Sequence, residues 1–172
     1  ETPGVFRPFG EFDPSAFPGT SAETVVVCDA ATGRVLYEKN ASVPRAVAST
    51  QKLVSALVVL DAGNLDKPVR VAASDVAVEP TRLGLKPGEV YTRRTLLYTF
   101  LVKSANDVAN VLARDNAGSI PAFAAKMNAK VRSLGCTNSY FVNPHGLTAP
   151  GQHSTARDMA RVAMVAYRNT TI

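Results

Sequence analysis

A single β-hairpin near the start of the chain has to be buried by something else in the fold. Residues 24–28 are rich in β-branched side chains, which predicts a buried strand, and 35–39 predicts the strand that returns beside it. Gly33 lies in the turn between them and is free to take a positive φ. A two-stranded hairpin alone is marginally stable in water. Either helices cover this hairpin, or further strands that this chain does not contain belong beside it.

Helical periodicity dominates the chain after Pro44. Leu53, Ala56, Leu57 and Leu60 recur at the spacing that places them on one face of a helix. The same kind of pattern predicts helices over 49–60, 93–101, 107–113, 121–134 and 155–167, and a short strand lies at 69–71. One hairpin followed by a helical block predicts an α+β fold.

The ends of these helices carry signals of their own. Gly63, Gly118 and Gly135 follow helical stretches, where a glycine favours termination. Thr155 and Asp158 have the spacing of a capping box, with Asp in place of the usual Glu. We therefore expect the last helix to begin at Thr155.

Residues 1–22 differ in composition from the rest of the chain. They contain four prolines and three glycines, which predict an extended arm rather than a helix or a strand. No apolar run approaches the roughly 20 residues that span a bilayer. The first four residues lack the basic region and apolar core of a signal peptide. We expect an extended arm over 1–22, one domain over 23–172, and a signal peptide that has been removed.

The chain has 172 residues and a formal net charge of +5, which suits an anionic partner. The basic residues are scattered, and only Arg93 and Arg94 are adjacent, whereas nucleic-acid readers usually show a basic stripe with interleaved aromatics. We expect no nucleic-acid partner. No set of His, Cys or carboxylate residues has a metal-ligand spacing, so we expect no metal site.

Two cysteines, Cys28 and Cys136, lie far apart in the sequence. One interpretation makes them separate buried thiols that behave as small apolar groups. The other joins them in a disulfide, which requires an oxidising compartment.

Ser49 and Lys52 are the first candidates for chemistry. Residues three apart near a helix start share one face, so the hydroxyl and the amine could meet within hydrogen-bonding distance. This is the arrangement of a serine nucleophile activated by a neighbouring base, and the helix N-terminus would stabilise an oxyanion. The competing interpretation is a capping serine beside a solvated lysine. A lysine base at neutral pH also needs its pKa lowered by about 3 units, through burial or through a nearby cation such as Lys103.

A second candidate pair lies at a break between two helical stretches. Ser104 and Asn106 are two residues apart, and both side chains could point into one cleft. The hydroxyl could relay a proton, while the amide could hold a substrate carbonyl or the lysine. The competing interpretation is a helix cap, a role that Ser, Asn and the following Asp107 all favour.

Together these motifs resemble those of the serine D-alanyl-D-alanine carboxypeptidases, the low-molecular-mass penicillin-binding proteins. The likeness covers about 24–167 in the family's order, and its Asn-Pro-His-Gly-Leu segment favours this family over the related β-lactamases. The matching segments are 31–33, 35–37, 48–52, 84–89, 104–107, 143–147 and 153–158. The resemblance implies a penicillin-binding-protein/β-lactamase-like transpeptidase fold, with residues 23–172 forming part of a carboxypeptidase-like catalytic domain.

The resemblance also implies a reaction and its residues. Ser49 would be the acyl-accepting nucleophile, Lys52 its general base, Ser104 the proton relay to the leaving amine, and Asn106 the residue that orients the substrate. The bond broken would join the terminal D-alanines of peptidoglycan stem peptides, without a cofactor. β-Lactam antibiotics would acylate the same serine. The protein would work in the bacterial cell envelope, periplasmic or extracellular. His145 matches a family marker, but we expect only a structural role in a turn, and we expect His153 at the surface or in a cap.

One family motif is missing from this chain. No Lys, Arg or His is followed by Thr-Gly or Ser-Gly, whereas the family carries Lys-Thr-Gly on a strand after the helical block. We therefore expect the C-terminal sheet strands to be absent from this chain. Three explanations remain open: a fragment of a longer protein, a remainder that is disordered or present as a companion C-terminal chain, and a degenerate homologue.

Two alternatives to the carboxypeptidase follow from this departure. A degenerate homologue would bind peptidoglycan peptides, or serve structurally, without cleaving them. A class A β-lactamase needs a Glu followed three residues later by Asn, and no Glu of this chain has that partner. We therefore expect any penicilloyl adduct to be released slowly.

Overall fold

The fold of residues 19–171 is described by a computed structural model. The first hairpin forms as expected, with β1 (Val25–Cys28) antiparallel to β2 (Val35–Lys39). A turn from Asp29 to Gly33 joins them, and Gly33 has a φ of 74°. Among the described residues, this sheet has two strands only. The structure agrees with the expectation that this chain lacks further strands of the sheet.

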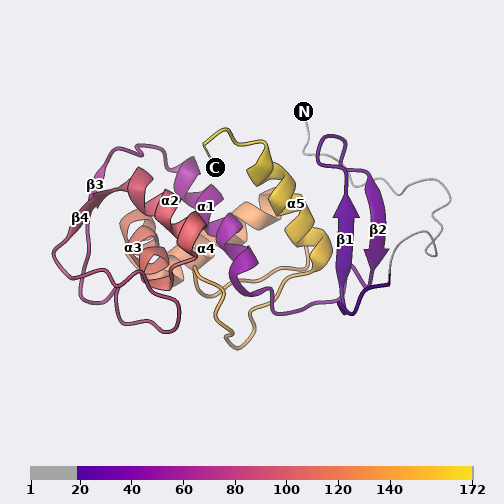
Figure 1. The fold of residues 1–172 in the computed structure, drawn as a ribbon, viewed down its shortest axis with the longest axis horizontal. Helices are drawn as coiled ribbons and strands as arrows, with labels where there is room; N and C mark the ends of the chain where they lie inside the picture. Colours follow the sequence, from indigo (N-terminus) through magenta and orange to yellow (C-terminus); the bar gives the residue numbers. More distant parts are fainter. Residues whose placement is uncertain (1–18, 172) are drawn as a thin grey trace.

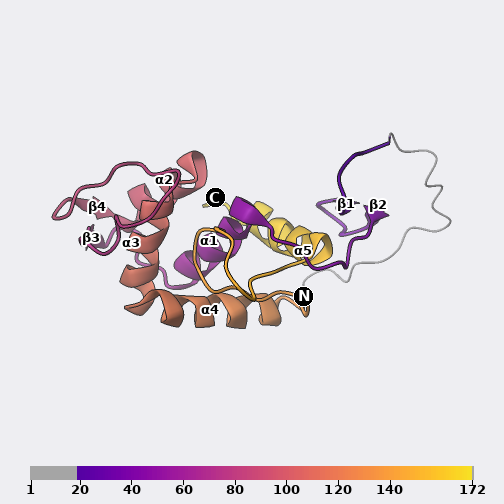
Figure 2. The ribbon, with the colours of Figure 1, turned by 90° about the horizontal axis from the view of Figure 1, so that it is seen from below.

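Five helices form the main body of the molecule, and all five expected helical segments are confirmed. Figure 1 shows α1 near the middle, with the first hairpin beside α5 at one end and a second hairpin beyond α3 at the other. In the turned view of Figure 2, α4 runs below α1. The helices are α1 (Lys52–Asp61), α2 (Arg93–Lys103), α3 (Asn106–Ala117), α4 (Ile120–Ser133) and α5 (Ala156–Tyr167).

The sequence predicts only one of the two strands of the second hairpin. The predicted strand at 69–71 corresponds to β3 (Pro68–Arg70), but its antiparallel partner β4 (Val90–Thr92) was not predicted. β4 runs directly into α2, which begins at Arg93, so the helical pattern that follows it obscures the strand. Since about twenty residues separate the two strands, tertiary packing rather than a tight turn brings them together.

α1 is the centre of the core. It packs against α2, α3, α4 and α5, so side chains are buried on every side of the helix. Apolar residues from the surrounding segments complete the core; the largest that are fully buried include Phe100, Phe123, Phe141, Leu97 and Leu112. A helix buried all round places its first residue, Lys52, inside the protein.

The capping box expected at α5 forms only in part. Thr155 Oγ1 accepts a hydrogen bond from Asp158 N, as that motif requires. The Asp158 carboxylate instead accepts from Asn138 N and from the Ser139 hydroxyl. The shorter Asp side chain therefore ties α5 to the preceding loop rather than closing the cap.

Among residues 19–171, α5 is the helix that covers the first hairpin. β1 contacts α5, and an apolar groove of about 510 Å³ lies between them, lined in part by Val25, Val47, Leu53 and Met159. Helices therefore bury part of the hairpin and leave a groove beside it.

The structure also bears on the cysteines, on the N-terminal arm and on membrane-spanning helices. Cys28 and Cys136 are both free thiols, so the disulfide interpretation is wrong. The predicted arm over 1–22 lies mostly outside the described residues, and 19–22 are exposed and belong to no helix or strand. Within the described chain, no helix is long and apolar enough to cross a bilayer.

Candidate active site

Ser49 and Lys52 lie where a short helical turn leads into the central helix. Residues Ala48–Gln51 form a 3₁₀ turn, η2, and α1 begins at Lys52. Side chains three apart are nearly eclipsed in a 3₁₀ turn, so this local form brings Ser49 and Lys52 together. Ser49 is exposed, while Lys52 is only 4% exposed. Ser49 is therefore open to solvent, whereas the amine that contacts it is buried.

The buried amine is surrounded by three oxygen atoms. Lys52 Nζ donates to Ser49 Oγ at 2.9 Å, to Asn106 Oδ1 at 2.9 Å and to the His145 carbonyl oxygen at 2.7 Å. An ammonium group has three N–H donors, so each one has an acceptor. Three segments that are distant in the sequence meet at this nitrogen. The expected contact of Ser49 with Lys52 is present, and Asn106 joins them.

Burial changes the acid–base behaviour of this amine. It lowers the pKa of Lys52 from 10.5 to about 8, because loss of water penalises the charged form. The alternative cause, the charge of Lys103, is not at work, and Lys103 is exposed at the end of α2. A substantial fraction of Lys52 is therefore neutral slightly above physiological pH.

Asn106 reaches the site from the start of α3. The chain breaks between α2 and α3 at Ser104, whose φ of 55° is left-handed, and this break lets α3 begin at Asn106. The side-chain amide of Asn106 donates to the Pro80 carbonyl oxygen at 2.6 Å, while its own oxygen accepts from Lys52. Asn106 is therefore held from both ends.

Ser104 lies two residues before Asn106 in the sequence. Among the described residues, no hydrogen bond joins its hydroxyl to Ser49 or Lys52. It is half-buried and forms the C-cap of α2. A role for Ser104 as a proton relay therefore stays a prediction.

The turn 143–147 contributes more to the site than the sequence predicted. His145, expected as a structural histidine, supplies a main-chain oxygen to Lys52. Gly146 packs directly on the backbone of Ala48: a Cβ built on Gly146 would lie 2.0 Å from the Ala48 oxygen. Only glycine fits at this contact. The Pro-His-Gly sequence hinted at a special turn, but a main-chain acceptor leaves no residue signature of its own.

A second set of hydrogen bonds fixes this turn against the helix. Ser55 Oγ donates to the Pro144 oxygen at 2.7 Å, and Gln51 Nε2 donates to the Asn143 oxygen at 2.7 Å. Gln51 and Ser55 are buried. The turn therefore sits rigidly on the same stretch that carries Ser49 and Lys52.

The ring of His145 is kept neutral. Burial, together with the nearby charge of Lys52, lowers the pKa of His145 to about 4. Its Nδ1 accepts a hydrogen bond from Leu147 N at 3.2 Å, so the ring proton sits on Nε2. His153, by contrast, pairs with Tyr140 in an isolated bridge between loops. Neither histidine ring takes part in the Lys52 cluster.

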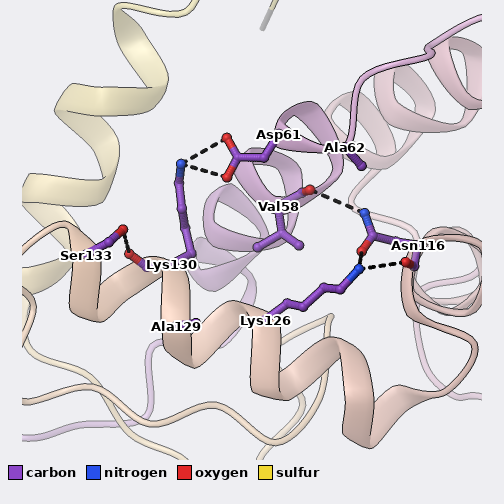
Figure 3. A pocket seen from close by; sticks show the side chains of 8 residues that line it. All are labelled: Val58, Asp61, Ala62, Asn116, Lys126, Ala129, Lys130 and Ser133. Carbon is purple, nitrogen blue, oxygen red and sulfur yellow. Dashed lines mark hydrogen bonds and ion pairs between the residues drawn. The ribbon is translucent and has the colours of Figure 1, made fainter.

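Figure 3 shows a hollow of about 490 Å³ that is separate from this site. It lies at the far end of α1, beside Val58 and Asp61, and its charged groups are already paired. Lys130 binds Asp61, and Lys126 donates to Asn116 at the end of α3. No group of three or more His, Cys or carboxylate side chains within residues 19–171 could hold a metal.

Comparison with known proteins matches this arrangement to one family. The family model for D-alanyl-D-alanine carboxypeptidases covers residues 13–172. The carboxypeptidase DacB2 of Mycobacterium tuberculosis is 39% identical over 154 residues, covering 88% of this chain and 53% of that protein. The carboxypeptidase DacF of Bacillus subtilis is 36% identical over 149 residues, covering 83% of this chain and 38% of that protein. This chain therefore spans about half or less of these relatives.

Solved structures agree with the sequence relatives. The crystal structure of a D-alanyl-D-alanine carboxypeptidase from Mycobacterium tuberculosis H37Rv superposes with a TM-score of 0.86 at 38% identity, covering 90% of this chain and 59% of that one. Penicillin binding protein 5 from Haemophilus influenzae superposes with a TM-score of 0.83 at 28% identity, covering 89% of this chain and 47% of that one. The fold is that of the penicillin-binding proteins, and the chain belongs to the D-alanyl-D-alanine carboxypeptidase family.

Proposed function

We propose that this protein hydrolyses the bond between the terminal D-alanines of peptidoglycan stem peptides through an acyl-enzyme on Ser49. The observation that carries the proposal is the contact of Lys52 Nζ with Ser49 Oγ at 2.9 Å. The family membership supports the choice of substrate. β-Lactams, which present a reactive acyl group to the same serine, are the second class of ligand.

The surroundings of Lys52 support its role as the general base. When the amine is neutral, two N–H groups remain, and the Asn106 and His145 oxygens accept them. The lone pair is then left facing Ser49 Oγ. A pKa of about 8 keeps the neutral form accessible near physiological pH. Lys52 thus takes the Ser49 proton as the serine oxygen bonds to the substrate carbonyl carbon.

The remaining steps follow the same atoms. The carbonyl oxygen becomes an oxyanion, and the Ser49 N–H, at the start of a helix, stabilises part of its charge. When the tetrahedral intermediate collapses, the C–N bond breaks and the leaving amine takes a proton from Lys52, relayed by Ser104. Water then attacks the ester and restores Ser49. Asn106 holds the substrate amide beside Lys52.

We place this activity in the bacterial cell envelope, periplasmic or extracellular, because peptidoglycan lies outside the cytoplasmic membrane. The sequence lacks Lys-Thr-Gly, so a second oxyanion donor has to come from elsewhere. A companion C-terminal segment is the source that we propose.

The experiment is an intact-protein mass spectrum with and without benzylpenicillin. We expect a covalent adduct on the natural chain, on Ser74→Ala as the control at another exposed serine, and none on Ser49→Ala. An adduct that persists on Ser49→Ala would overturn the assignment. Saturable binding of a stem peptide without any adduct would favour a non-catalytic binding protein.

A further inference from the structure

Two adjacent residues at the start of α3 tie the segment 80–85 to the active site. Asn106 donates to this segment at Pro80 and Asp107 accepts from it at Leu83, so the two side chains hold it at two places. Both residues are buried: Asn106 is 3% exposed and Asp107 is 0% exposed. The segment itself belongs to no helix or strand. Its shape therefore depends on these contacts.

Pro80 decides which way the Asn106 amide faces. The two ends of an Asn amide have the same shape but opposite hydrogen-bonding character. A carbonyl oxygen can only accept, so the Pro80 oxygen requires Nδ2 on its side, at 2.6 Å. Oδ1 is then left to face Lys52 Nζ. The backbone of Asn106 adds a further tie by donating to the Thr81 oxygen at 2.8 Å.

Asp107 fixes the other half of the segment. Its carboxylate accepts from the main-chain N–H groups of Leu83, Gly84 and Leu85 at 3.0, 2.9 and 3.1 Å. Main-chain N–H groups of consecutive residues converge on a single anion only in a restricted backbone shape. Gly84 adopts a φ of 86° within this shape. Asp107 thus sets the path of the chain that carries Pro80 and Thr81.

We propose that Asp107 is a positioning residue for Ser49 acylation: by locking segment 80–85, it holds the Pro80 oxygen where it orients the Asn106 amide toward Lys52. The inference rests on the proposed function. If the segment moved, the amide could turn over and present N–H groups to the lysine. One of the acceptors around Lys52 would then be replaced by a donor, and the lysine would lose its alignment with Ser49.

A pair of glycine substitutions tests this without touching a charge. Gly84→Ala strains the locked segment through the backbone alone. The φ of 86° disfavours any residue with a Cβ, while nothing lies within 4 Å of the added Cβ, so no clash contributes. Gly88→Ala is the matched control, because its φ is 95° and its surroundings are equally open. Its N–H donates to the Val71 oxygen and its oxygen accepts from Arg70, so it makes no contact with Asp107. We expect Gly84→Ala to slow acylation by benzylpenicillin about tenfold or more, with little change in the initial binding constant. Gly88→Ala should match the natural chain.

A double-mutant cycle separates positioning from general stability. Asp107→Asn keeps the size of the side chain and loses part of its accepting capacity, and we expect acylation to slow about 10- to 100-fold. In an Asn106→Ala background the same change should cost less than about twofold, because the residue through which it acts is gone. Equal losses in both backgrounds would overturn the proposal. If Asp107→Asn does not fold, Gly84→Ala in both backgrounds replaces it.

A measurement that needs no activity distinguishes this proposal from the proposed function. The side-chain NH₂ signals of Asn106, assigned by their loss in Asn106→Ala, report how firmly Nδ2 is held. We expect their hydrogen exchange to be slow in the natural chain and in Gly88→Ala, and about tenfold or more faster in Gly84→Ala. Unchanged exchange in Gly84→Ala would overturn the positioning role. Faster exchange in a chain that benzylpenicillin never labels would keep the positioning role and reject only the reaction.

Discussion

The Lys52 amine is buried almost completely from solvent and lies close to three oxygen atoms. Desolvation disfavours the charged form and lowers the pKa of Lys52 to about 8. Below that pH the amine is protonated and cannot accept the Ser49 proton. The proposed role of Lys52 as a base therefore depends on its burial in the fold.

The pH dependence of acylation tests this property. We expect the acylation rate with benzylpenicillin to rise with pH and to level off above an apparent pKa of about 8, as Lys52 loses its proton. Rapid-quench mass spectrometry between about pH 6 and pH 10 measures it. Lys52→Arg, which stays protonated throughout, serves as the inactive control. A flat profile in the natural chain would reject Lys52 as the base.

His145 makes stability depend on pH in the acidic range. Its folded-state pKa of about 4 lies below the ordinary value of 6.5, so the unfolded chain binds more protons between these pH values. The free energy of unfolding should fall as pH drops from about 6.5 to about 4, by at most about 3 kcal/mol. Urea denaturation across this range measures the loss. His145→Asn can still accept from Leu147 N and should lack this component; an identical pH dependence would contradict it.

Gly146 is a residue that cannot be replaced without disturbing the site, because only glycine fits there. Gly146→Ala would bring a Cβ within 2.4 Å of the Ala48 carbonyl carbon and 3.0 Å of Ser49 N, so the backbone that carries Ser49 has to move. We expect a loss of more than about 2 kcal/mol in the free energy of unfolding and about 100-fold slower acylation. Gly151→Ala has a similar positive φ but open space, and should cost only about 1 kcal/mol. Equal effects of the two changes would argue against the contact.

At the scale of elements, α3 is attached to the second hairpin region by an ion pair whose acidic partner is buried and whose arginine is partly exposed. Arg114 binds Asp75, which is 2% exposed, and also donates to the Arg70 oxygen. Arg94 and Asp66 form a comparable pair at the surface. Removing one partner of a buried pair leaves an uncompensated charge, whereas a surface pair contributes little.

This contrast in burial predicts two different losses in the free energy of unfolding. Arg114→Met should lower the free energy of unfolding by about 3 kcal/mol, and Arg94→Met by less than about 1 kcal/mol. Urea denaturation of both variants is the measurement. Adding Asp75→Asn to Arg114→Met removes the stranded charge and should recover part of the loss. Similar losses in the free energy of unfolding for the two arginines would show that the attachment of α3 does not depend on the Arg114–Asp75 pair.

At the scale of the whole molecule, the chain carries one side of the proposed acyl-transfer site. Ser49, Lys52 and Asn106 are assembled within it, while Lys-Thr-Gly is absent from its sequence and β1 borders a groove. Loss of one oxyanion donor typically slows an acyl-transfer enzyme about 10²- to 10³-fold. We expect benzylpenicillin to acylate this chain more slowly, by about that factor, than it acylates the Mycobacterium tuberculosis relative DacB2. Side-by-side mass spectra measure both rates, and equal rates would mean that the site is already complete.

Local patterns in the sequence predicted the first hairpin, the five helices and the Ser49–Lys52 pair, because strand and helix periods place neighbouring side chains without reference to the rest of the chain. They missed β4, because it runs directly into the helical pattern of α2. They named two causes for a lowered pKa of Lys52, burial and the cation Lys103, and burial is the one at work.

The tertiary structure alone decided what surrounds Lys52. Its acceptors come from positions 49, 106 and 145, and one of them is a main-chain oxygen. Every residue has such an oxygen, so the sequence has no means of marking the one that is used. The sequence by itself determined which groups are chemically suited to the reaction. Long-range packing determined which of them meet, because contacts between distant segments depend on how the whole core is filled.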